Sequence, residues 1–190
     1  MTPDIAAVVL EPAPADSDLA QLPESLVTRV LEGSVAGGTR RWIVAEADGA
    51  DARAVLQTLC ESVPREAIAV TLIGRGLETE ADGWAPERVT HVMPVAISAP
   101  ASAVDDIDRW YREEHNEMLL RCPDWVRVRR YAIESIEGAA WSRLALHELS
   151  SGDVLQSDEV RAAMATPWRR RLATQPWFLS DGRDPLAVVR

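Results

Sequence analysis

The chain has 190 residues, of which 47% are hydrophobic and 26% are charged, which is typical of a globular protein large enough to bury a core. Its formal net charge of −10 argues against nucleic acid and anionic membrane surfaces as partners. It contains no lysine, which excludes chemistry through a lysine Schiff base.

The two cysteines and the N-terminal residues indicate the compartment. Cys60 and Cys122 follow no disulfide spacing, which favours a reducing environment. Residues 1–12 have no basic region followed by a long apolar run, and no apolar stretch reaches the roughly 18 residues of a membrane span. We therefore expect a cytoplasmic protein with no membrane contact.

The first half of the chain alternates strand-like and helix-like segments. Leu22, Leu26 and Val30 have helical spacing and precede the glycine pair at residues 37–38, so a helix is predicted there. The predicted elements, in chain order, are a strand at 4–12, a helix at 19–38, a strand at 39–49, a helix at 50–63 and a strand at 67–77. One strand of a regular repeat is not evident in this half.

The second half has the same order of elements. The acidic segment 78–88, with its Gly and Pro, is the predicted boundary. The predicted elements after it are a strand at 89–98, a helix at 104–122, strands at 125–136 and 141–150, a helix at 158–172 broken at Pro167, and a strand at 185–190. We therefore divide the chain into a degenerate ferredoxin-like half, 1–84, and a second ferredoxin-like half, 85–190, that carries the site.

A weak match between the halves favours an internal duplication. RRWIVAEADG aligns with SRLALHELSSG, so that Arg41 matches Arg143 and Glu46 matches Glu148. The predicted fold class is α+β, with an antiparallel sheet that carries helices on one face. The other apolar face needs cover, and a second sheet from the tandem half or from another chain would supply it.

The second half resembles a known family. DIDRWYREEHNEMLLRCPDWVRVRRYAI, WSRLALHELSS and AAMATPWRRRL are similar to the EthD-like branch of the dimeric α/β-barrel superfamily, over about residues 88–185. The resemblance implies a ferredoxin-like α/β barrel with an acid-base pocket between helix and sheet, and it puts His115 at the family's helix histidine. Members include cofactor-free cyclases, isomerases, decarboxylases and dehydratases that act on aromatic or polyketide-like molecules, besides monooxygenases and haem-handling proteins. Single-domain members dimerise, so we expect a homodimer or an intrachain pseudo-dimer.

The helix at 104–122 carries the main catalytic candidate. At about 100° per residue its apolar face holds Val104, Ile107, Tyr111, Met118 and Cys122, and His115 lies towards the edge of that face. Tyr111 and Asp108 precede His115 by four and seven residues on the same side, and we predict that they orient it as a general base. The alternative is an interfacial histidine bonded to a backbone carbonyl.

His147 and Glu148 are the second pair of catalytic candidates. Neighbours in a strand point to opposite faces, so one of them should line the pocket with His115 and the other should face the second sheet. A satisfied structural pair is the alternative. His91, in an apolar strand, is a weaker candidate for substrate binding.

The remaining substrate-binding candidates are aromatic, apolar or basic. Trp110 and Met118 would contact a flat apolar ligand, although packing also explains the tryptophans. Arg130 or Tyr131 would hold a carboxylate or oxyanion. Arg127 and Arg129 share the other strand face, and we expect them to be exposed and paired with the acidic surface.

No metal or cofactor is expected. The three histidines are far apart in sequence without an HExxH motif, and nothing singles out a haem site or a dinucleotide fingerprint. The sequence therefore predicts a cofactor-independent enzyme that performs cyclisation, isomerisation, dehydration or decarboxylation on a small aromatic or polyketide-like carbonyl compound. The alternatives are a non-catalytic small-molecule-binding protein of the same fold and a cofactor-free monooxygenase.

Overall fold

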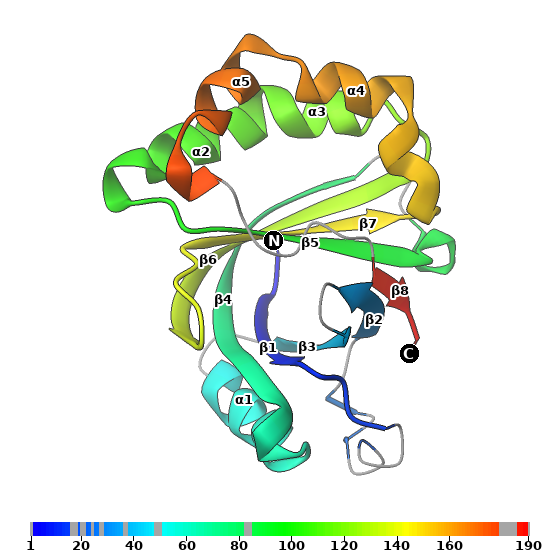
Figure 1. The fold of residues 1–190 in the computed structure, drawn as a ribbon, viewed down its shortest axis with the longest axis vertical. Coiled ribbons are helices and arrows are strands. Elements are labelled where there is room, and N and C mark those ends of the chain that lie inside the picture. The colour runs from blue at the N-terminus through cyan, green and yellow to red at the C-terminus, as the bar shows by residue number, and fades with distance from the viewer. Residues whose placement is uncertain are drawn as a thin grey trace.

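The protein is a closed β-barrel with helices on its outside (Figure 1). The computed structural model describes residues 2–15, 19, 22–23, 25–26, 29–35, 38–47, 51–81, 85–178 and 186–189. The strands in these residues are β1 (Asp4–Leu10), β2 (Arg29–Val35), β3 (Gly38–Ala47), β4 (Ile68–Ala81), β5 (His91–Ile97), β6 (Trp125–Glu137), β7 (Arg143–Leu149) and β8 (Leu186–Val188). They close in the order β1-β3-β2-β8-β5-β7-β6-β4, and every pair is antiparallel.

The two halves of the chain arrange their strands alike. The first four strands lie in the order β4-β1-β3-β2 and the last four in the order β8-β5-β7-β6. The halves join where β2 pairs with β8 and where β4 pairs with β6. Barrel closure therefore occurs within one chain. The predicted boundary segment is partly strand, because β4 continues to Ala81 and pairs there with Arg127.

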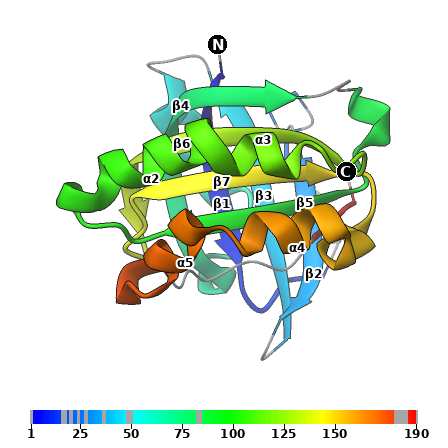
Figure 2. The same cartoon turned by 90° about the horizontal axis from the view of Figure 1, so that it is seen from above.

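The helices lie on two sides of the barrel. Helix α1 (Ala52–Glu61) packs on β1, β3 and β4, whereas the second half carries α2 (Val104–Trp110), α3 (Asn116–Leu119), α4 (Asp158–Met164) and α5 (Pro167–Ala173). These four helices form a layer over β5, β6 and β7 (Figures 1 and 2). The break at Pro167 between α4 and α5 is confirmed. Among the described residues, no helix has the length and apolar character needed to cross a membrane.

Apolar side chains fill both the barrel and the space beneath the helices. Leu31, Trp42, Leu72, Val92 and Leu144 are at most 1% exposed and belong to the core inside the barrel. A separate core lies between β5-β7-β6 and the helix layer. The sheet of the second half is thus buried on both faces, and each of its side chains must fit one of two dry environments.

The predicted helix at 19–38 is wrong in its C-terminal part, because residues 29–35 form β2. Val30 continues the helical spacing of Leu22 and Leu26, but the backbone of Val30 and Leu31 pairs with β3, and Leu31 also pairs with β8. Tertiary pairing therefore overrides the local pattern. Residues 16–18, 20–21, 24, 27–28 and 36–37 of this region lie outside the described residues. β2 is the strand that the sequence did not make evident.

The turn after β6 gives a test of the fold. Gly138 has a φ of +83°, and a Cβ there would lie 2.0 Å from the carbonyl oxygen of Ala69. We predict that Gly138→Ala lowers the free energy of unfolding by more than about 1 kcal/mol. Alanine disfavours the positive φ, and its Cβ would clash with the carbonyl oxygen of Ala69. Urea denaturation would measure this, with exposed Ala140→Gly in the same turn as the control. Equal losses in the two variants would contradict the assignment.

Candidate active site

A cavity of about 260 Å³ lies between the helix layer and the outer face of the second-half sheet. Its wall is mostly apolar and aromatic, and it includes two of the three histidines. The lining residues are Met93, Val95 and Ile97 of β5, Trp125 and His147 of β6 and β7, Trp110, Tyr111 and His115 of the long helix, and Leu155, Val160, Met164, Arg169 and Phe178. Small apolar ligands commonly bind in hollows of this composition.

The long helix over the sheet contains a π-helical turn at Tyr111–His115, between α2 and α3. A π turn inserts an extra residue, so the helix face rotates relative to the regular α-helix that was predicted. As a result Trp110, Tyr111, His115 and Asn116 are all buried, whereas Met118 is only partly buried. The turn brings the side chains of Trp110, Tyr111 and His115 to one wall of the cavity.

The imidazole of His115 lies inside the protein and lines the cavity. It is 5% exposed and stacks on Trp110, with ring centroids 4.0 Å apart and ring planes 21° apart. Tyr111 meets it edge-on at 5.3 Å, and the ring centroid of His147 is 6.5 Å away. These aromatic contacts fix the ring orientation while leaving it at the cavity surface.

His147 differs from His115 in its electrostatic environment. The indole Nε1 of Trp125 donates a hydrogen bond to its Nδ1 at 3.2 Å, so in the neutral ring the proton is on Nε2. Burial, helped by the charge of Arg130, lowers the pKa of His147 to about 3. His147 is therefore a neutral imidazole at pH 7 that offers an N–H donor rather than a basic lone pair.

In its described contacts, the carboxylate of Asp108 binds arginines and does not contact His115. Its carboxylate accepts hydrogen bonds from Arg143 Nε at 3.0 Å and Nη2 at 2.9 Å, and it pairs with Arg130. Burial acts to raise the pKa of Asp108, but the Arg143 hydrogen bonds and the Arg130 charge outweigh burial and hold the pKa below its usual value. The predicted orienting role of Asp108 has no support in these contacts.

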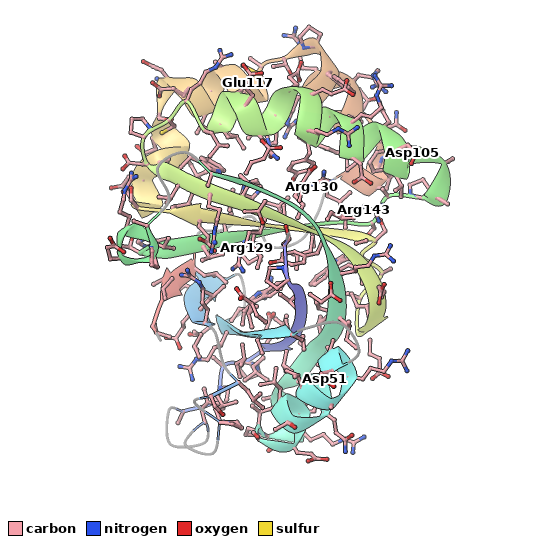
Figure 3. All side chains as sticks on the ribbon, turned by 180° about the vertical axis from the view of Figure 1, so that it is seen from behind. Asp51, Asp105, Glu117, Arg129, Arg130 and Arg143 are labelled. Carbon is pink, nitrogen blue, oxygen red and sulfur yellow. The ribbon has the colours of Figure 1, made fainter. Side chains whose placement is uncertain are left out.

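Arg130 lies behind the cavity wall rather than in it. Its guanidinium is 4.3 Å from the ring centroid of Tyr111 and pairs with Glu78 and Asp108. Figure 3 shows Arg130 on the helix side of the sheet and Arg129 on the barrel side. Arg130 is thus a buried cation beneath Tyr111, where its charge reaches the cavity through the wall.

Glu148 and Tyr131 point into the barrel, away from the cavity. Arg127 donates two hydrogen bonds to Glu148 at 2.7 and 2.8 Å, and Arg129 pairs with Glu148 at 2.9 Å and with Glu46 at 2.7 Å. The expectation that Arg127 and Arg129 are exposed is therefore wrong, because the buried carboxylate of Glu148 pairs with both. Burial raises the pKa of Tyr131 to about 12, so its phenol stays protonated.

Two further candidates also lie outside the cavity lining. Met118 packs against the core beneath the helices, and His91 accepts or donates a 2.9 Å hydrogen bond with Thr90 beside Gly152.

Of the ten candidates, the structure brings Trp110, Tyr111, His115 and His147 together. Sequence reasoning missed Arg169 and Phe178. The alternation of side chains along β5 was the signal that could have placed Met93, Val95 and Ile97 on the cavity face of the sheet.

The described residues contain no group of three or more His, Cys, Asp or Glu side chains placed to hold a metal ion. Among the described residues that line the cavity, the side chains of these types are those of His115 and His147. Imidazoles can transfer protons and form hydrogen bonds.

Comparison with known proteins identifies the fold. No family model matches the chain, and no curated protein matches it. Among solved structures, an anthrone oxidase-like protein has a TM-score of 0.64 at 10% identity, covering 100% of this chain and 92% of the other. Chlorite dismutase from Candidatus Nitrospira defluvii has a TM-score of 0.62 at 10% identity, covering 100% and 92%. A heme-degrading enzyme from Listeria monocytogenes has a TM-score of 0.56 at 8% identity, covering 97% and 98%.

The chain shares the fold of these solved structures, which is an α+β closed antiparallel barrel with helices outside it, and the predicted α+β class is confirmed. At such low identity the similarity extends to the fold alone.

The buried neutral His147 predicts a pH dependence of stability. Because its folded-state pKa lies below the ordinary 6.5, the unfolded state binds the extra proton between pH 6.5 and about 3. The free energy of unfolding should therefore fall as the pH drops below 6.5, by up to about 1.4 kcal/mol per pH unit from this residue. Urea denaturation at pH 7 and pH 5 would measure it.

His147→Asn is the matched variant, because its amide oxygen can still accept from Trp125 but does not titrate. We expect the variant to lose less stability than the wild type between pH 7 and pH 5. Parallel losses would show that His147 is not buried as a neutral ring.

Proposed function

We propose that the protein is a cofactor-independent enzyme that transfers protons on a small aromatic or polyketide-like carbonyl compound. One observation carries the proposal: two imidazoles in different environments line one apolar cavity. Pairs of titratable groups whose surroundings give the two groups different proton affinities are characteristic of acid-base sites. The net reaction would be a cyclisation, isomerisation, dehydration or decarboxylation.

The two histidines take different parts in the proposed reaction. His147 holds its proton on Nε2 and is suited to stabilise the oxyanion of an enolate or phenolate by hydrogen bonding. The abstraction of a proton from carbon or oxygen then falls to His115. Trp110 and Tyr111 hold the His115 ring, and the apolar wall excludes water from the ionising substrate.

Two further parts of the proposal concern the origin of the chain and its family branch. The identical order β4-β1-β3-β2 and β8-β5-β7-β6 supports an origin by tandem duplication, with the halves forming a pseudo-dimer. The placement of His115 beside the sheet supports membership of the EthD-like branch. Homodimer formation and a cytoplasmic location stay predictions.

The residues do not fit a haem. The cavity of about 260 Å³ is below the usual range for drug-sized ligands, and a porphyrin is larger than those. Nδ1 of His147 already accepts from Trp125, and its Nε2 carries the ring proton, so neither nitrogen of this ring offers iron a lone pair. No step of the proposed reaction passes through such a group.

Replacement of His115 tests the proposal. We predict that the wild-type protein accelerates deuterium exchange at the acidic carbon of 2-tetralone in D₂O, measured by proton NMR. His115→Ala should lower this rate by about 10²–10⁴-fold, the usual effect of losing a general base. His91→Gln should exchange at the wild-type rate, since the structure places His91 outside the cavity lining.

The results separate catalysis from binding alone. An exchange rate that is unchanged in His115→Ala would remove this residue from the mechanism. Fluorescence quenching of the cavity tryptophans without any exchange would instead support the non-catalytic binding protein.

A cofactor-free monooxygenase is the second candidate, and the fold similarity to an anthrone oxidase-like protein favours it. It shares the first step, because deprotonation yields the electron-rich anion that reacts with oxygen. We predict that, in this case, anthrone consumes oxygen in the presence of the wild-type protein and that His115→Ala slows the uptake by at least about 10²-fold. An oxygen electrode would measure it. Exchange with 2-tetralone but no uptake with anthrone would favour the first candidate.

A further inference from the structure

A β-bulge in β6 turns Trp125 towards the cavity. The register between β6 and β7 shifts between Trp125 and Arg127. Val126 packs in the core inside the barrel, and Arg127 also points inwards, where it pairs with Glu148. Trp125, in contrast, belongs to the core beneath the helices and lines the cavity, although in a regular strand it would share a face with Arg127. Bulges beside functional sites commonly redirect one side chain in this way.

The redirected indole meets the imidazole of His147. Nε1 of Trp125 donates to Nδ1 of His147 at 3.2 Å, and the two rings meet edge-on with centroids 5.2 Å apart and planes 83° apart. Both residues are 1% exposed, and the backbone N–H of Trp125 donates to the carbonyl of Cys122 at 2.9 Å. A proton on Nδ1 would face the indole N–H, so this contact selects the tautomer that carries its proton on Nε2.

The selected tautomer presents one hydrogen-bond donor to the cavity. His147 lines the cavity, and among the residues that the structure describes none accepts a hydrogen bond from its Nε2. A buried donor without an acceptor is unfavourable, so an acceptor atom of a bound molecule is favoured in front of Nε2. A donor group at the same place would oppose the N–H, because the lone pair of a ring held in this tautomer is already bonded to the indole.

We propose that Trp125 sets the ligand specificity of the cavity. By holding His147 in the Nε2–H tautomer, Trp125 makes the cavity select ring compounds that present a hydrogen-bond acceptor to His147 and reject those that present a donor there. The inference rests on the proposed function and deepens it, because the acceptor of the substrate would be its carbonyl oxygen. Trp125 acts through His147 and is therefore a positioning residue.

Two pairs of ligands of nearly equal shape test the acceptor preference. Quinoline differs from naphthalene by one acceptor nitrogen, and indole differs from indene by one N–H donor. ¹⁵N NMR of wild-type protein labelled at histidine would show the tautomer of His147, and His147→Asn would identify its signals. At pH 7 we expect the proton on Nε2. Quinoline should move this proton signal downfield relative to naphthalene, through the new hydrogen bond, whereas indole should not do so relative to indene.

Trp125→Phe tests the cause of the preference, with Trp168→Phe as the matched control. The first variant removes the indole donor to His147, and the second removes an indole donor that bonds to Asp106 at 3.2 Å outside the cavity lining. Equilibrium dialysis would give the dissociation constants of all four compounds. In Trp125→Phe the preference for indole over indene should rise about 2- to 10-fold above that of the wild type, the usual size of one neutral hydrogen bond, because Nε2 can then accept. Trp168→Phe should keep the wild-type preference.

Three results would overturn the inference. They are a proton on Nδ1 of His147 in the wild type, the lack of a downfield shift with quinoline, and a preference for indole that is unchanged in Trp125→Phe. The first two are measured on the wild-type protein, so they can overturn the inference even where Trp125→Phe does not fold.

This test and the test of the proposed function fail separately. If 2-tetralone exchange depends on His115 but quinoline leaves the His147 signals unchanged, the enzyme proposal stands and Trp125 does not set its specificity. If quinoline binds to Nε2–H but no exchange depends on His115, the cavity selects acceptors without the proposed acid-base chemistry.

Discussion

Burial of the second-half sheet on both faces is the constraint from which the site follows. Successive side chains of β7 must enter different dry compartments, one beneath the helices and one inside the barrel. His147 and Glu148 are adjacent in sequence, and both are at most 1% exposed. Burial, together with the charge of Arg130, lowers the pKa of His147, so its ring is neutral. Glu148 meets several guanidinium groups, so it keeps its charge, and its pKa stays low despite burial.

The same alternation on β6 builds the charged cluster inside the barrel. Arg127 and Arg129 reach Glu148, and Arg129 also reaches Glu46 on β3. Arg29 on β2 lies 3.7 Å from Glu148. The cluster therefore joins strands of both halves across the barrel, and a register shift of one residue would move its charges to the wrong face. Removal of one member would leave buried charge uncompensated, which commonly costs about 3–5 kcal/mol.

The sequence predicts much of the fold because its local patterns agree with the tertiary arrangement. Strand alternation separates His147 from Glu148 and Arg130 from Tyr131, and Pro167 breaks the last helix where expected. The exceptions have physical causes. β2 forms because Val30 and Leu31 find partner strands, which no local spacing reveals. The π turn at Tyr111–His115 depends on packing against the sheet, so a uniform helical wheel misplaces Trp110 and Met118.

The candidate site was predictable only in part, for a related reason. His115 and Tyr111 could be found because they share a helix face with apolar residues. The wall opposite the sheet comes from α4, α5 and the segment after them, whose approach to the long helix is set by long-range packing. Arg169 is the first of three successive arginines that look alike in sequence, and its contact with Phe178 and its place in the cavity lining distinguish it.

Arg130 links the electrostatics of the wall to the proposed reaction. The guanidinium lies over the Tyr111 ring, and its charge is one of the two causes that keep His147 neutral. A cation that disfavours a proton on His147 also favours an anion in front of it, because both effects arise from the same potential. Asp108 and Glu78 hold this cation and moderate its charge. In the proposed reaction, Arg130 would thus lower the energy of an enolate or phenolate without touching it, and His147 would supply the hydrogen bond that places the oxyanion.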